Sequence, residues 1–365
     1  MMDAASDTDT YAGKAAEFVE IPAPELPYKP PMPKVYRPKI GLIGTGGISA
    51  SHLDAYRTAG WEVAALWNRT QAKAKVKAAE YCPAARIVGD WRDILTNPQI
   101  DVVDITLHPE HRAPIIEAAL KAGKHVLSQK PFVSDLKVGA KLVALAEANN
   151  VFLAVNQNGR WSPHFSWMRA ALKAGLIGNV ISVHSAVHWD HSWTAGTPFD
   201  EVEDLILYDF GIHWFDALTS FIGARDCSVY ATATYASEQL NKVPLLAQAL
   251  VQFDGGHASL VFDGAVKTGA RDTTVICGTN GMLTSTGSDL STQKVTLTTL
   301  DGVAQPKLEG QWFNDGFQGA MGALLVAIET RKEPENSAKD NLHSLRLTFA
   351  ARESKESQKA INIKV

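Results

Sequence analysis

The alternation of apolar and polar positions divides the chain near residue 158. Between residues 39 and 158, short and nearly continuous apolar runs alternate with longer candidate helices. Such runs are typical of strands covered on both faces, so the alternation predicts a parallel sheet with crossover helices. The expected strands are Lys39–Ile43, Glu62–Trp67, Arg86–Val88, Val102–Thr106, His125–Ser128 and Val151–Val155, and the longest expected helices are Pro109–Ala122 and Ser134–Asn149.

After residue 158 the pattern changes to strand-like segments separated by turn residues. A candidate helix, His164–Ala174, comes first, and Asp254-Gly255-Gly256 is a later hairpin signal. Strands joined by tight turns pair in the antiparallel sense. The expected strands are Val180–Asp190, Cys227–Tyr235, Ala247–Phe253, Ala258–Phe262, Thr273–Cys277, Gly281–Thr284 and Val295–Leu300. Near the end, apolar side chains at helical spacing predict a core helix, namely Phe317, Met321, Leu324, Leu325 and Ile328.

Residues 1–38 form a separate, proline-rich extension. Seven prolines between residues 21 and 38 fix φ and remove backbone donors, which favours an extended conformation. The first 20 residues lack the basic start and apolar stretch of an export signal. Two interpretations stay open: a disordered leader, or an arm along its own or a neighbouring subunit, with Tyr28 and Tyr36 as apolar anchors.

The first expected strand runs into a glycine-rich turn, Gly44-Thr45-Gly46-Gly47-Ile48-Ser49, which opens a helix. Gly44 permits a tight turn, Gly46 lets a pyrophosphate approach the backbone, and Ser49 is small enough for close helix–strand packing. The helix N-terminus then meets the negative charge. Because this turn lies within a strand–helix–strand unit, it predicts a dinucleotide-binding Rossmann domain over residues 39–158.

The second expected strand ends in Asn68-Arg69-Thr70, where the adenosine ribose of a dinucleotide is bound. No carboxylate is present to repel a 2′-phosphate, and the Arg69 guanidinium can fork onto one. This favours NADP over NAD. In the alternative interpretation Arg69 points to solvent and Asn68 serves the ribose of NAD.

Hydride exchange between an alcohol carbon and a nicotinamide needs a group that takes up or returns the hydroxyl proton. His213 suits this role near neutral pH, and Asp209, four residues earlier, lies on the same face of a helix and can fix the imidazole tautomer. Lys130 follows the fifth strand at the ligand-binding edge of the sheet, where its ammonium favours an alkoxide. We expect these three residues to be catalytic.

The motifs around these residues resemble the Gfo/Idh/MocA oxidoreductases. Ala122–Pro131 is similar to that family's AGKHV…EKP, residues 106–111 to T-P-N-x-x-H, and Asn158–Pro163 to N-x-R-[aromatic]-x-P. Gln129 replaces the usual glutamate, and Leu107 and His108 replace Pro and Asn. The resemblance implies the same catalytic Lys130, Asp209 and His213. It also implies cofactor contacts at Thr106, His108, His111, Gln129, Lys130 and Asn158 and a substrate contact at Arg160.

The resemblance covers nearly the whole chain after residue 38, and it completes the expected fold class. The prediction is an α/β protein with a Rossmann domain at 39–158 and an α+β substrate-binding domain at 159–365. The second domain is expected to hold a large, open, mainly antiparallel sheet. Because the family uses the outer face of this sheet for association, we expect a homo-oligomer, with the N-terminal arm as a further contact.

Five of the nine tryptophans lie between residues 161 and 214, beside a group of histidines. Aromatic faces with nearby polar groups suit a sugar or cyclitol ring, so His188, Trp189 and Trp193 join Lys130, Asp209 and His213 as candidate substrate contacts. His188, Asp190 and His191 could alternatively converge on a metal ion. Polar lining of a pocket is the favoured interpretation, and no metal is predicted.

Composition narrows the class of partner. The formal net charge of −4 lacks the basic surface that nucleic acid or an anionic membrane attracts, and no apolar run of about 18 residues is present. The three cysteines, Cys82, Cys227 and Cys277, are far apart and form no CxxC pair, which indicates reduced thiols and a cytoplasmic protein.

The sequence therefore predicts an NAD(P)-dependent oxidoreductase that acts on a sugar, cyclitol or related polyol derivative, with His213 as acid/base. The alternatives are a redox-assisted glycoside-cleaving enzyme of the same family, a non-catalytic NAD(P)-linked sensor, and a metal-dependent hydrolase built on the histidine cluster.

Overall fold

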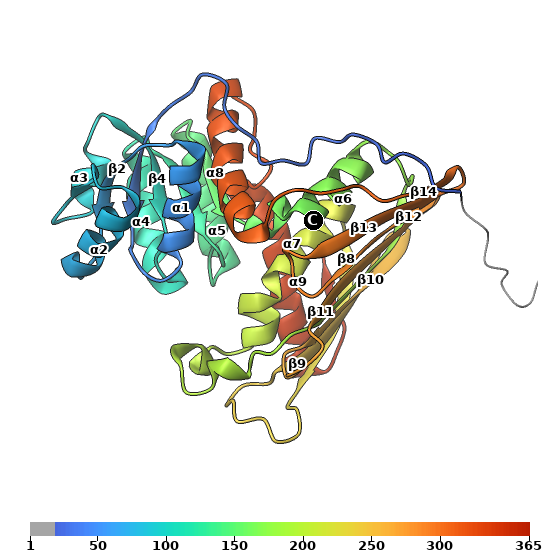
Figure 1. Ribbon diagram of the computed structural model, residues 1–365. Coiled ribbons are helices and arrows are strands. Elements are labelled where there is room, and N and C mark those ends of the chain that lie inside the picture. The colour runs from blue at the N-terminus through green and yellow to red at the C-terminus, as the bar shows by residue number, and fades with distance from the viewer. Residues whose placement is uncertain (1–18) are drawn as a thin grey trace, which may run out of the picture.

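The computed structural model describes residues 19–365, and its first part is a six-stranded parallel sheet (Figure 1). The strand order β3-β2-β1-β4-β5-β6 is that of a dinucleotide-binding fold. The predicted strands are confirmed. They are β1 (Lys39–Ile43), β2 (Val63–Trp67), β3 (Arg86–Ile87), β4 (Ile100–Ile105), β5 (His125–Gln129) and β6 (Leu153–Asn156). The helices between them are α1 (Ser49–Ala59), α2 (Gln71–Tyr81), α3 (Arg92–Leu95), α4 (Pro109–Lys121) and α5 (Leu136–Ala148).

The second sheet has nine strands in the order β14-β13-β12-β11-β7-β10-β9-β8-β15. Its neighbours pair antiparallel except β7 with β10, which confirms a mainly antiparallel sheet. The strands are β7 (Val180–His188), β8 (Cys227–Thr234), β9 (Leu246–Phe253), β10 (Gly256–Asp263), β11 (Arg271–Gly278), β12 (Gly281–Gly287), β13 (Gln293–Thr299), β14 (Gly302–Ala304) and β15 (Ile361–Ile363).

Helices cover only one face of this second sheet. These are α6 (Pro163–Lys173), α7 (Ile212–Ile222) and α9 (Ala338–Ser357), seen side-on in Figure 1. Strand β9 shows the consequence, since its buried and exposed residues alternate along its length. The opposite face carries no helix within residues 19–365, and it exposes the apolar side chains of Ile181, Tyr230 and Leu250.

The helix α8 (Trp312–Thr330) returns the chain to the first sheet. Its apolar residues Phe317, Met321 and Leu324 lie in the same core as Ile40 and Leu42 of β1, as their helical spacing predicts. Residues 159–365 thus contribute to the cores of both sheets.

The described chain contains no helix of the length and apolarity that crossing a membrane requires.

Short irregular helices connect these elements near the junction of the two parts. They are η1 (Asn158–Trp161), η2 (Ser192–Thr194), η3 (Pro198–Glu201) and the π-helical turn η4 (Ile206–Phe210).

Residues 19–38 form an extended arm along the chain's own body, which favours the arm over the leader for these residues. The arm runs in Figure 1 from the β14 edge over the top of the molecule to the first sheet. Its far end pairs with Val303 of β14, and Lys29 forms an ion pair with Glu309 (2.8 Å). Tyr28 packs against the core beneath the second sheet, and Tyr36 packs against the core that β1 shares with α8, which confirms both as anchors. Residues 1–18 of the extension lie outside the described residues.

One carboxylate fastens the arm to α8. Glu329 accepts hydrogen bonds from the backbone N–H groups of Lys34, Val35 and Tyr36 at 2.7 to 2.9 Å. A side chain at Gly322 would collide with the Pro31 carbonyl, so the glycine permits this close approach.

We predict that Glu329→Ala lowers the melting temperature and speeds tryptic cleavage after Lys34, because three arm donors lose their acceptor. Glu333→Ala, an exposed carboxylate near the end of the same helix, is the matched control and should change neither. Equal cleavage rates for both variants would show that the arm does not depend on this contact.

Candidate active site

The glycine-rich turn, residues 44–48, lies between β1 and α1 at the carboxyl edge of the first sheet. The strand order reverses between β1 and β4, which is where such sheets bind ligands. Gly44 has φ +105°, a conformation that other residues rarely adopt, and the Thr106 hydroxyl donates to its carbonyl. A Cβ at Gly46 or Gly47 would meet nothing within 4 Å, so the backbone there is open to a pyrophosphate.

The end of β2 braces this turn. Asn68 accepts a hydrogen bond from the Thr45 N–H (3.0 Å) and donates to the Thr70 carbonyl (3.1 Å). Arg69 is exposed and forms no ion pair with any residue in the described part of the chain. The turn, the helix N-terminus and this guanidinium fit a dinucleotide.

Lys130 leaves the end of β5 and reaches across to η4. Its ammonium donates to the main-chain carbonyl of Asp209 (2.8 Å) and lies 3.4 Å from the Asp209 carboxylate. The peptide bond between Lys130 and Pro131 is cis. Arg112 of α4, fully buried, donates to the carbonyls of Gln129 and Pro131 and so holds both sides of Lys130.

Arg112 was not found from the sequence. Its partners are main-chain carbonyls, so no neighbouring acidic side chain signals its role. Burial lowers the pKa of Arg112 to about 9.

The expected hydrogen bond between Asp209 and His213 is not observed within the described residues. The N–H of Gly211 bonds to the carbonyl of Ile206, five residues earlier, so Asp209 lies on a π-helical turn and His213 on the regular helix α7. The Asp209 carboxylate faces Lys130 instead. His213 is 7% exposed, and its Nδ1 has no hydrogen-bond partner among residues 19–365. Burial, and then the charge of Lys130, hold the pKa of His213 well below its usual range.

Aromatic rings surround His213. Trp312, the first residue of α8, packs edge-on against it with ring centroids 5.4 Å apart, and its indole N–H donates to the side-chain Oδ1 of Asn158 (3.0 Å). Trp189 lies against Trp214 (5.5 Å) and Trp312 (6.5 Å). Trp312 was missed because it lies almost 100 residues beyond the other members of the cluster.

Two family models match this chain. One, the oxidoreductase family with an NAD-binding Rossmann fold, matches residues 38–157, and the other, the GFO/IDH/MocA C-terminal domain, matches residues 165–284. The chain belongs to the GFO/IDH/MocA oxidoreductase family. This confirms the resemblance of the motifs, and it identifies residues 38–157 as the NAD-binding Rossmann fold of an oxidoreductase.

Relatives of this GFO/IDH/MocA chain include D-apiose dehydrogenase of Paraburkholderia graminis, 28% identical over 346 residues, which are 90% of this chain and 91% of that protein. The 1,5-anhydro-D-fructose reductase of Ensifer adhaerens is 27% identical over 316 residues, 84% and 92% of the two chains. In fold, the chain is similar to scyllo-inositol dehydrogenase from Lactobacillus casei with bound NAD(H) and scyllo-inositol. The TM-score is 0.75 at 22% identity, over 90% and 99% of the two chains.

Two expected substrate contacts of this GFO/IDH/MocA chain lie elsewhere. Arg160 is buried, because η1 turns it inward, and it forms a two-point ion pair with Asp216 (2.7 and 2.8 Å) and another with Asp340 (2.6 Å). His188 follows the outward side of β7, whose neighbours Val183 and Val187 face the core, and it pairs with Asp263 (2.7 Å) on the uncovered face. Neither side chain faces His213.

The remaining predicted residues lie in different surroundings. Trp189 lies within the aromatic cluster, whereas Trp193 is 56% exposed and packs on Phe199. His108 and His111 are exposed at the start of α4. Two expected cofactor contacts use their side chains within the protein: Gln129 turns inward, and Asn158 binds Trp312.

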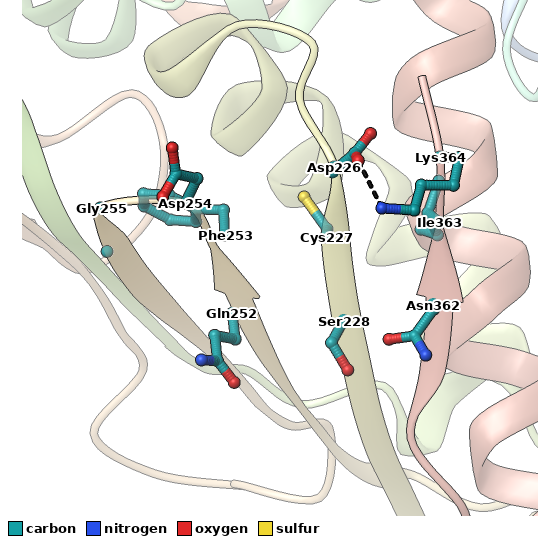
Figure 2. Close-up of a pocket in the computed structure, with 11 residues that line it drawn as sticks. Asp226, Cys227, Ser228, Gln252, Phe253, Asp254, Gly255, Asn362, Ile363 and Lys364 are labelled. Carbon is teal, nitrogen blue, oxygen red and sulfur yellow. Dashed lines mark hydrogen bonds and ion pairs between the residues drawn. The ribbon is translucent and has the colours of Figure 1, made fainter.

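The alternative metal site is not formed. Within the described residues, three or more metal-ligating side chains come within 4.8 Å of one another only at Glu203, Asp204 and Glu356, where Lys355 and Arg352 already bind Asp204. A hollow of about 730 Å³ lies on the uncovered sheet face beside β8, β9 and β15 (Figure 2), and neither Lys130 nor His213 lines it.

Proposed function

We propose that this chain transfers a hydride between a nicotinamide cofactor and a CH–OH group of a sugar, cyclitol or related polyol derivative. The observation that carries the proposal is the Lys130 ammonium, held by Asp209, beside a buried His213 at the carboxyl edge of an NAD(P)-binding sheet. Relatives named for D-apiose, 1,5-anhydro-D-fructose and inositol support the substrate class.

The cofactor would be held by the backbone N–H groups of residues 44–48, with Asn68 and Arg69 at the ribose end. When bound, the nicotinamide supplies the site that accepts or returns a hydride. We take Thr106, His108 and His111, at and beyond the carboxyl end of β4, as the nearest further candidates for contact.

Lys130 orients the substrate hydroxyl and stabilises the oxygen as negative charge develops on it. Asp209 keeps the ammonium in place. His213, kept neutral by burial, takes the hydroxyl proton in oxidation and returns it in reduction. Trp189 and Trp312 offer apolar faces to the CH-rich side of a ring. A sensor would need no such proton-transfer group, so the cluster favours an enzyme.

The test of the proposal is a panel of neutral sugars and cyclitols, including scyllo-inositol and D-apiose, with NAD and NADP and the absorbance of reduced nicotinamide as readout. We predict that His213→Ala lowers kcat by about 100-fold or more while cofactor affinity stays nearly unchanged. His343→Ala, which removes a histidine of α9 that lies against Arg346, is the control. Full turnover by His213→Ala would exclude it as the acid/base.

The same proposal sets the pH dependence. Oxidation needs a neutral imidazole, and the lowered pKa of His213 keeps it neutral to lower pH than an ordinary histidine. The acid limb of kcat/KM for oxidation should therefore lie below the usual histidine pKa of about 6.5.

We propose NADP as the preferred cofactor, because Arg69 is exposed beside the braced turn and no carboxylate lies at residues 68–70. Arg69→Ala should raise KM for NADP by about 10- to 100-fold, the equivalent of a lost hydrogen bond to a charged group, and leave KM for NAD unchanged. Lys73→Ala is the control for a loss of nearby positive charge. A wild-type preference for NAD would overturn this choice.

We further propose a cytoplasmic homo-oligomer that associates through the uncovered sheet face. Ile181, Tyr230 and Leu250 expose apolar surface there, and the hollow of Figure 2 lies at its edge. The three cysteines are free thiols, which suits a reducing compartment.

Leu250→Asp should lower the mass measured by sedimentation velocity, because it places a charge within the buried contact. Val76→Asp, which adds a charge to an exposed apolar position of α2, should leave the mass unchanged. A monomeric wild type would contradict association through this face.

A further inference from the structure

A chain of buried polar side chains lies directly behind the Lys130 turn. It consists of Asp104 from β4, His52 from α1, Gln129 from β5 and Asn156 from β6, each no more than 6% exposed. Three strands of the first sheet and the helix α1 thus contribute to one buried cluster. Unpaired polar groups are costly at such depth, so their pairing must be specific.

The hydrogen bonds fix the orientation of the Gln129 amide. The Oε1 of Gln129 accepts from the backbone N–H of Lys130 (2.6 Å) and from the Asn156 amide (3.2 Å), so its Nε2 must face the other way. That Nε2 lies 3.2 Å from the His52 Nε2, and the Asn156 Nδ2 lies equally close to it.

The tautomer of His52 follows from these donors. Amide NH₂ groups only donate, so the Nε2 of His52 must be an unprotonated acceptor. Its proton is then on Nδ1, which donates to the Asp104 carboxylate (2.8 Å). Tyr56 donates to the same carboxylate oxygen (2.7 Å).

We infer that His52 is a positioning residue for Lys130, acting through Gln129. This inference rests on the proposed function of Lys130. The link runs from α1, the helix opened by the cofactor turn, through His52 and the Gln129 amide to the backbone N–H of Lys130. It therefore connects the proposed cofactor-binding turn to Lys130, the residue proposed to bind the substrate oxygen.

The link also accounts for Gln129. A carboxylate in its place would present only acceptor oxygens to the unprotonated Nε2 of His52, and the hydrogen bond would be lost unless that nitrogen gained a proton. Glutamine supplies the donor that a neutral imidazole needs.

Three variants test the inference. His52→Phe removes the hydrogen bonds of His52 to Asp104 and to Gln129. We expect kcat to fall by about 10- to 100-fold with little change in cofactor affinity, since a slight misplacement of Lys130 impairs the reaction. His52→Gln, whose amide offers both a donor and an acceptor, should restore part of this loss. Tyr56→Phe removes the second donor to Asp104 but leaves the path to Gln129, so it should lower stability without lowering kcat.

The tautomer of His52 can be measured by NMR without any substrate. Long-range ¹H–¹⁵N NMR of the whole protein at mildly alkaline pH, with His52 assigned by the His52→Gln variant, should show a neutral ring protonated on Nδ1. A ring protonated on Nε2 would overturn the inference, as would an equal loss of kcat in Tyr56→Phe and His52→Phe. If Lys130→Met keeps full turnover, the proposed function fails instead, whatever the tautomer of His52.

Discussion

The hydrogen bond from Lys130 to the main-chain carbonyl of Asp209 joins the two halves of the molecule at the site of the proposed chemistry. Lys130 belongs to the carboxyl edge of the parallel sheet, and Asp209 to the π-helical turn before α7. The ammonium is placed only if both halves keep their relative position. The contacts of Arg112, Arg160, α8 and the arm all bear on this placement.

Four features hold Lys130 and the surrounding elements in place. Arg112 holds the main chain on both sides of Lys130 from within the first half. Arg160 joins η1 to α7 and α9 through Asp216 and Asp340, and loss of one partner from such a buried pair costs about 3–5 kcal/mol. The helix α8 packs on the first sheet while its Trp312 covers His213. The arm then ties α8 to the edge of the second sheet.

Most strands of both sheets, the glycine turn and the three proposed catalytic residues could be predicted from sequence, because apolar alternation and short motifs are local signals. The three-residue edge strands β14 and β15 were not predicted. The partners of the proposed catalytic residues could not be predicted either. Asp209 binds Lys130 and not His213, and residue spacing does not reveal that pairing. Arg160 was expected to contact substrate because it lies in a family motif, but η1 turns it inward to Asp216 and Asp340. Trp312 and His52 act through contacts with segments 100 or more residues away.

The most direct measurement is single-turnover hydride transfer in wild type and Lys130→Met, with saturating cofactor and a neutral sugar or cyclitol from the panel. If Lys130 holds the substrate oxygen, the variant should transfer the hydride about 100-fold more slowly or worse while binding the cofactor as tightly as wild type. Transfer by Lys130→Met at the wild-type rate would contradict the proposed site, and so would a wild type that binds cofactor and turns over no member of the panel.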